Sequence, residues 1–191
     1  MSIKNYRSLK KLLLLGSLMM LPILGCTASD EVTLHNGSVV KGKVVDNEPS
    51  YIKFTYEGED VPTSIGKVAI SSIKFNSGRV EDCTEKVVIT DPKTEYEKIN
   101  VFREKEDVIG LYRIKEISAK SGGEFAISDK EGRYIAKTIK KLQKIAAQMG
   151  GCAILITSQT GNSGSFWKNP HSAMTAVVYA YSKEYVIPEE K

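Results

Sequence analysis

Apolar and polar residues alternate along residues 30–83, and this period of two predicts β-strands. Residues 51–56 show the pattern most clearly, because Ile52, Phe54 and Tyr56 would share one face of a strand. The apolar stretches are short and evenly spaced. We therefore expect five short strands arranged as a small antiparallel β roll or barrel.

Turn-forming residues separate these strands. Asn36-Gly37 is the strongest hairpin signal, because both positions of such a two-residue turn need positive φ. Gly42 lies inside an expected strand and indicates a β-bulge. Further turn clusters, rich in Asp, Asn, Glu, Gly and Pro, are expected at residues 46–49, 57–60 and 76–78.

The spacing of apolar residues changes to steps of three and four after residue 129, which predicts a helix. Ser128 and Glu131 form a capping box at its start, and Gly150-Gly151 supplies a left-handed stop. A row of lysines on the opposite side is expected to be a solvated face, with anionic lipid headgroups as the alternative ligand. The apolar face contains Ile135, Ile139, Leu142, Ala146 and Met149, and the lysines are Lys137, Lys140, Lys141 and Lys144.

Apolar runs on either side of the helix predict three strands. A second module is therefore expected over residues 99–187, in the order strand, helix, strand and strand, and the whole chain is expected to be α+β. Residues 84–98 show little periodicity and are expected to hold a short strand at 86–90 followed by a linker. The three strands of the second module are expected at residues 109–117, 152–156 and 176–181.

Residues 158–172 are predicted to be a long loop, and long loops on a folded scaffold often carry binding groups. Trp167 is the only Trp; it could anchor a partner or fold back over the sheet. The glycines of this segment do not match a phosphate-binding loop. The candidate binding residues are Phe166, Trp167, Lys168 and His171.

The amino-terminal leader has a basic start at residues 1–11 and an apolar run at residues 12–24, which together predict a secretory signal peptide over residues 1–25. The apolar run is shorter than the about 20 residues that span a bilayer. Four of the 27 basic residues lie in this leader, which has no acidic residue. The remaining 23 basic and 23 acidic residues balance, so the charge gives no indication of a nucleic-acid partner.

Ile23-Leu24-Gly25-Cys26 resembles the lipobox of bacterial lipoproteins, although Leu24 is bulkier than the usual residue at its position. The resemblance implies thioether lipidation of Cys26, cleavage before it and acylation, for example by palmitate, of the new amino terminus. It also implies a bacterial cell-envelope location with a lipid anchor, and Thr27 favours the outer membrane. The alternative is ordinary signal-peptide cleavage a few residues later, with release into the periplasm.

Both modules also resemble known envelope proteins. The first resembles a small β module of Bacteroidetes envelope proteins, through Val32, Leu34, Asn36, Gly37, Val40, Gly42, Val44, Ile52, Phe54, Ile73, Phe75 and Gly78. The second is similar to the α/β fold of the Rcs stress-sensor lipoprotein and the YbjQ-like proteins, through Ile109, Gly110, Ile114, Ala146, Ala147, Gly150, Gly151, Ala153 and Ile154. These are packing and turn residues, and the sensor's cysteine pattern is absent, so the resemblance implies a fold and no activity.

Two cysteines remain if Cys26 carries lipid. Cys83 and Cys152 could form a disulfide in an oxidising compartment, closing a loop of about 69 residues worth ~4 kcal/mol in the chain-entropy model. Alternatively, Cys152 is a buried apolar residue at the start of a strand. His35 and His171 are the other soft ligands, and none of the four lies at metal-ligand spacing, so we expect no metal and no cofactor.

Two functions are compatible with these patterns. The first is a non-catalytic envelope protein that binds an unidentified protein or envelope component through its second module. The second is a small envelope hydrolase or thiol enzyme, which would need Cys152 and His171 to meet in a cleft with a depressed thiol pKa. No carboxylate pair stands out for acid–base catalysis, and we expect the first function.

Overall fold

The computed structural model of the chain describes residues 29–122, 131–162 and 171–185. These residues form an α+β structure of two mainly antiparallel sheets and the helix α2 (Glu131–Gln148), which packs on the second sheet. The predicted signal peptide, Cys26 and the capping residue Ser128 lie outside the described residues, as do Phe166, Trp167 and Lys168.

The first sheet contains six antiparallel strands in the order β4-β3-β2-β1-β5-β6. One strand more than predicted is present, because the short 3-10 helix η1 (Lys67–Ala69) divides the apolar stretch after Ile65. The end strands β4 and β6 do not pair, so the sheet is open and the predicted alternative of a closed barrel is wrong. The strands are β1 (Asp30–Leu34), β2 (Val39–Asn47), β3 (Tyr51–Tyr56), β4 (Thr63–Gly66), β5 (Ile70–Lys74) and β6 (Val80–Asp82).

The alternation in the sequence correctly predicts the core of this sheet. Ile52 and Phe54 are fully buried, and Tyr56 packs edge-on against Phe54 with ring centroids 5.2 Å apart. Polar contacts link β6 to β2 and η1. The Glu81 carboxylate lies 3.2 Å from Nδ2 of Asn47, the last residue of β2, and 3.7 Å from Nζ of Lys67 in η1. The core cluster consists of Val32, Ile52, Phe54, Ile65, Ala69, Ile70 and Ile73.

Two glycines show how local sequence shapes this sheet. The predicted hairpin at Asn36-Gly37 is present and Gly37 has φ +90°, but the loop has three residues, 35–37, instead of two, because Leu34 N donates to Ser38 O at 2.9 Å. The bulge predicted at Gly42 is wrong, because the β2–β3 register breaks at Val45 instead. Gly42 is needed for close packing, since a Cβ there would lie 2.0 Å from Thr55 O and 2.8 Å from the Phe54 ring.

The second sheet has the order β7-β9-β10-β8, in which only β7 runs parallel to its neighbour. The predicted order of strand, helix, strand and strand is present as β8, α2, β9 and β10, and β7 was not predicted. The strand predicted from residue 109 begins only at Tyr112, because Gly110 (φ +92°) turns the chain. The bounds are β7 (Asn100–Phe102), β8 (Tyr112–Gly122), β9 (Ala153–Asn162) and β10 (His171–Ala180).

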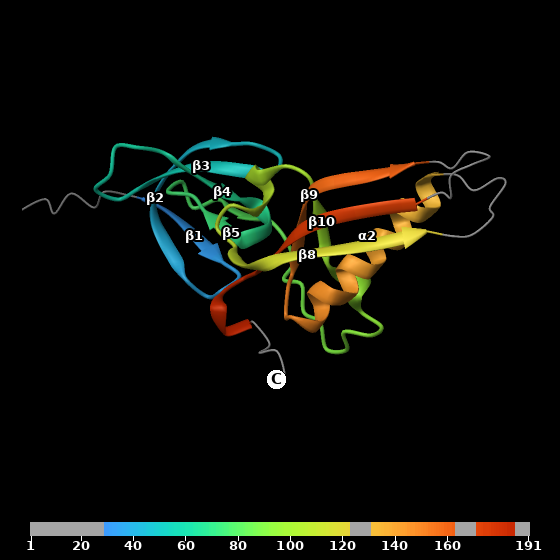
Figure 1. Cartoon of the computed structure of the whole chain (residues 1–191). Helices are drawn as coiled ribbons and strands as arrows, with labels where there is room; N and C mark the ends of the chain where they lie inside the picture. Colours follow the sequence, from blue (N-terminus) through green and yellow to red (C-terminus); the bar gives the residue numbers. More distant parts are fainter. Residues whose placement is uncertain (1–28, 123–130, 163–170, 186–191) are drawn as a thin grey trace, which may run out of the picture.

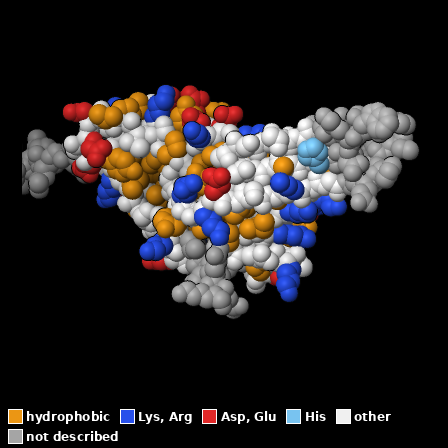
Figure 2. Space-filling model, viewed as in Figure 1, with side chains coloured by type: hydrophobic (Ala, Val, Ile, Leu, Met, Phe, Trp, Pro, Cys, Tyr) orange, Lys and Arg blue, Asp and Glu red, His pale blue; other side chains and the backbone are white. Residues whose placement is uncertain are grey.

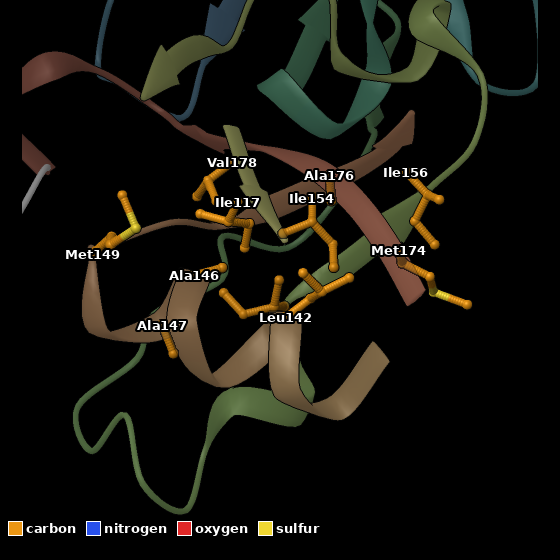
Figure 3. Close-up of a cluster of buried hydrophobic side chains, with 11 residues drawn as sticks. Ile117, Leu142, Ala146, Ala147, Met149, Ile154, Ile156, Met174, Ala176 and Val178 are labelled. Carbon is orange, nitrogen blue, oxygen red and sulfur yellow. The ribbon is translucent and has the colours of Figure 1, made fainter. Parts of the chain in front are cut away.

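Helix α2 covers one face of the second sheet with the predicted apolar stripe (Figure 3). Leu142 and Ala146 are fully buried against the sheet residues Ile154 and Val178. The helix ends as predicted at Gly150-Gly151. Gly150 has φ +75°, and Gly151 N donates to Ala146 O at 2.9 Å, which satisfies a carbonyl of the last turn.

The segment 84–98 is not the strand and linker predicted from the sequence. Residues 86–90 form no strand, and η2 (Tyr96–Lys98) is a single 3-10 turn. Val87 N donates to the Tyr181 hydroxyl at 2.8 Å, and Ile89 packs against the core beneath α2. The segment therefore lies along the second module instead of spanning a gap between two separate modules.

Candidate functional site

The two modules pack directly against each other. Leu111 contacts both the first core and a small cluster around Cys152 and Tyr181. Gly66 N donates to Ile109 O at 2.9 Å, and a Cβ on Gly66 would lie 2.4 Å from Asp107 O. The turn that contains η3 (Lys105–Val108) is therefore docked tightly on β4, and Figure 1 shows the two sheets meeting there.

A polar cluster lies beside this contact, and we call it the junction cluster: His35, Thr84, Cys152 and Tyr181. The His35 side chain is only 7% exposed, and its ring centroid lies 5.0 Å from that of Tyr181. His35 Nε2 is 2.9 Å from Thr84 Oγ1. Three segments far apart in the sequence are joined by these contacts.

The partners of Thr84 show which ring nitrogen of His35 donates a hydrogen bond. Thr84 Oγ1 lies 3.1 Å from Lys67 O and 3.0 Å from Ile70 O. Carbonyl oxygens only accept hydrogen bonds, so the single proton of the threonine hydroxyl points toward these two carbonyls and Oγ1 accepts from His35 Nε2. His35 Nε2 therefore carries a proton, and a lowered pKa favours the neutral form of the ring. Burial and the nearby Lys86 ammonium lower its pKa below 6.5 in agreement with this state.

Neither described cysteine is an activated nucleophile. Burial raises the pKa of Cys152 to about 12, and burial followed by the Glu81 carboxylate raises the pKa of Cys83. A reactive thiol needs the opposite shift, toward the thiolate. Cys83 lines a groove of about 610 Å³ together with His35 and Lys86, but the imidazole in this groove is already bound to Thr84.

Cys83 and Cys152 are both free thiols, so the structure contains no disulfide between them. Cys152 is 3% exposed and packs against Ala153 and Tyr181. Its environment is that of a small apolar residue preceding a strand, which was the alternative to the disulfide.

The structure does not bring Cys152 and His171 together. Cys152 N donates to Tyr179 O at one end of β10, at 2.8 Å, whereas His171 begins the same strand at its other end. At about 3.3 Å per residue, the two ends are separated by ~26 Å. A dyad of these two residues is excluded by this geometry.

Both ends of the predicted loop at residues 158–172 are strand, namely residues 158–162 and 171–172. β9 continues to Asn162 and β10 begins at His171, with Ser158 paired to Thr175 and Thr160 to Ala173. Of the four candidate binding residues, only His171 lies within the described residues, exposed at the start of β10. We call residues 118–122, 157–161 and 171–175 the sheet tip; in Figure 1 it extends away from the first module.

The sheet tip has one covered and one open face. On the covered face, Thr138 Oγ1 of α2 lies 3.3 Å from Ser172 O, and Met174 is buried. The strand register places Ala173 and Thr175, together with the residues of β8 and β9 that pair with them, on the face opposite α2. These are small or polar: Ser118, Lys120, Ser158 and Thr160, all of them exposed.

Comparison with known proteins gives no family for this chain. No family model matches it, and no curated protein or solved structure is significantly similar. Among residues 29–122, 131–162 and 171–185, no group of three His, Cys, Asp or Glu side chains could hold a metal ion. No helix within that part of the chain has the length and apolar character needed to cross a membrane.

The lysine row of α2 is exposed, but most of its members contact their own chain. Lys140 Nζ lies 2.8 Å from Glu97 Oε1, and Lys141 Nζ donates to Lys120 O at 2.6 Å. Lys144 Nζ lies 4.7 Å from the centre of the Tyr96 ring. These contacts draw the lysines toward neighbouring elements instead of presenting them together as a single anion site.

Proposed function

We propose that this protein is a lipid-anchored component of the bacterial cell envelope, in the outer membrane, that binds a protein or other envelope component and catalyses no reaction. The lipobox-like residues that end at Cys26 support the anchor. Several acyl chains together would hold the protein stably on a bilayer, since each buried CH₂ contributes ~0.8 kcal/mol.

The sheet tip is the observation that carries the binding role. It contains the exposed His171, and its strands β9 and β10 come directly before and after residues 163–170 in the sequence, which include the candidates Phe166, Trp167 and Lys168. The open face of the tip is small and polar, which suits a partner that also presents polar groups. The contact between the modules lies at the opposite end of β10, where Tyr181 meets His35.

The chemistry of the described residues supports binding over a thiol enzyme. The raised pKa of both thiols opposes nucleophilic catalysis. The separation of ~26 Å between the two ends of β10 removes the general base that was considered for Cys152.

Crosslinking in cells tests the binding role. We expect the full chain to give defined crosslinked partners, and Trp167→Ala to lose them. Val61→Ala is the matched control, because Val61 is 71% exposed but lies in the first module. Unchanged partners with Trp167→Ala would contradict binding through residues 158–172.

Mass spectrometry of the mature amino terminus tests the anchor separately. We expect the first residue to be Cys26 with a diacylglyceryl thioether and an acylated amine. Cys26→Ser should release the protein from the membrane fraction. An unmodified thiol, or a chain that begins a few residues later, would contradict lipidation while leaving the binding role untouched.

A further inference from the structure

The outer edge of β8 is the longest open sheet edge among the described strands. β8 has 11 residues and is the last strand of its sheet, whereas the other end strands, β4, β6 and β7, have four, three and three. An edge strand presents backbone N–H and C=O groups that a further strand can bond. One side chain of the same chain reaches this edge, since Lys141 Nζ donates to Lys120 O.

The surroundings of this edge are strongly basic. β8 carries Arg113, Lys115 and Lys120 against the single acid Glu116, and α2 carries five basic residues against Glu131. The chain after the leader is neutral, so the rest of the protein holds the compensating excess of acidic residues. In Figure 2, Lys and Arg side chains gather where Figure 1 places β8 and α2, whereas Asp and Glu side chains lie mostly over the first module, together with further Lys and Arg.

We propose that the β8 edge binds an extended, acidic segment of a protein partner, which adds to the second sheet as a further strand. This inference rests on the proposed function and names the partner's chemistry. Backbone hydrogen bonds to the edge supply affinity in such strand addition, and side chains at alternate positions supply selectivity.

The register of β8 shows where acidic side chains would lie. Lys120 is paired with Ala173 and Arg113 with Tyr179, which places both basic residues on the face of the sheet opposite α2. Ile117 and Ala119 face α2. Glu116, paired with Val177, lies between Arg113 and Lys120 on their face of the sheet, so a strand with Glu or Asp at every second position would meet these two basic residues near the two ends of β8. Each such cross-strand pair is worth roughly 0.2–1 kcal/mol.

Charge also argues against the other occupants of this edge. A second copy of the chain would bring the same basic strand against itself. An anionic lipid surface would bind through the lysines of α2, but Lys140 is paired with Glu97 and Lys144 lies over Tyr96. A bilayer also offers no backbone groups to pair with β8.

Three labelled peptides of about ten residues test the inference by fluorescence anisotropy with the full chain in neutral detergent micelles. The first alternates Glu and Thr, the second alternates Glu and Pro, and the third alternates Lys and Thr. We expect the Glu–Thr peptide to bind, and the Glu–Pro peptide to bind at least about tenfold more weakly because proline cannot pair along a strand. The Lys–Thr peptide should not bind.

Two variants with equal charge change locate the site. Arg113→Glu/Lys120→Glu should weaken binding of the Glu–Thr peptide by about tenfold or more. Lys43→Glu/Lys93→Glu is the matched control, because both lysines are exposed and lie outside β8 and α2. The affinity of this variant for the Glu–Thr peptide should stay within about twofold of that of the native chain. Hydrogen exchange should show that the bound Glu–Thr peptide slows the amides of β8.

Several outcomes would overturn the inference. Equal affinity for the Glu–Thr and Glu–Pro peptides would mean that charge alone is recognised. Slowed hydrogen exchange in a strand other than β8 would mean that the peptide binds elsewhere. Dimer formation through β8 in sedimentation experiments would assign the edge to self-association. Displacement of the Glu–Thr peptide by vesicles of anionic lipid would assign the basic surface to a membrane. None of these results bears on lipidation of Cys26 or on crosslinks lost with Trp167→Ala, so failure here is distinguishable from failure of the proposed function.

Discussion

The two sheets of this protein differ in the length of their edge strands and in the exposure of their strand ends. The first sheet ends in strands of three and four residues, and Glu81 of β6 contacts Asn47 of β2 and Lys67 of η1. The second sheet ends in the 11-residue strand β8 and extends into an exposed tip. The first sheet therefore has only short edge strands, whereas the second leaves the backbone groups of β8 and the polar side chains of the sheet tip open to other molecules.

Substitution in the first core should have the largest effect on stability. Phe54 is fully buried and its ring fits over Gly42, so Phe54→Ala should lower the free energy of unfolding by about 3–5 kcal/mol. Thr160→Ala at the exposed sheet tip should change it by less than about 0.5 kcal/mol. Chemical denaturation of both variants measures the comparison, and similar losses at the two sites would contradict it.

The contact between the modules should be sensitive to a single methyl group. Gly66→Ala would place a Cβ 2.4 Å from Asp107 O, and this backbone cannot move without separating η3 from β4; we expect a loss of about 2–3 kcal/mol. Gly132→Ala is the control, because its Cβ would meet nothing within 4 Å and should stabilise α2 by up to about 1 kcal/mol. Equal stability of the two variants would show that the contact at Gly66 is loose.

Leu111 should couple the unfolding of the two sheets. It is half-buried and packs against both the first core and the cluster around Tyr181, so Leu111→Ala should cost about 1–2 kcal/mol. We also expect the single thermal transition of the native chain to broaden or split, as the sheets lose a shared side chain. A shift of the transition without broadening would mean that other contacts, such as His35 with Tyr181, suffice for coupling.

The features that the sequence predicts correctly depend on residues that lie close together in the sequence. The Asn36-Gly37 hairpin and the Gly150-Gly151 stop each follow from backbone conformations that glycine favours. The apolar stripe of α2 follows from helical spacing. The core of the first sheet follows equally well, because strict alternation assigns each side chain to one face.

The features that it misses depend on residues far away in the sequence. β7 is three residues long and pairs with β9 about fifty residues later, so nothing local distinguishes it from a loop. Ser158 and Thr160 lie in a strand whose outer face is open, so no apolar alternation marks it. The junction cluster joins His35, Thr84 and Tyr181 only through tertiary packing.

Acid should weaken the contact between the modules by a smaller amount than any of the changes above. His35 is neutral in the folded state and its pKa lies below 6.5, so the unfolded chain binds the proton more readily. Its contribution to stability is therefore fully present above about pH 6.5 and is lost as pH falls through the folded pKa. Protonation would add a charge beside Lys86 in a site that is almost closed to solvent.

Denaturation between about pH 7.5 and 5 measures this effect, because this range runs from about one pH unit above the unfolded histidine pKa of ~6.5 to well below it. His35→Gln retains a donor for Thr84 Oγ1 but cannot be protonated, so its stability should fall less steeply with acid than that of the native chain. His171→Gln should retain the native slope, because His171 is exposed at the far end of β10. If His171→Gln flattened the profile instead, the acid-sensitive contact would lie at the sheet tip, and the junction would be the pH-insensitive part of the molecule.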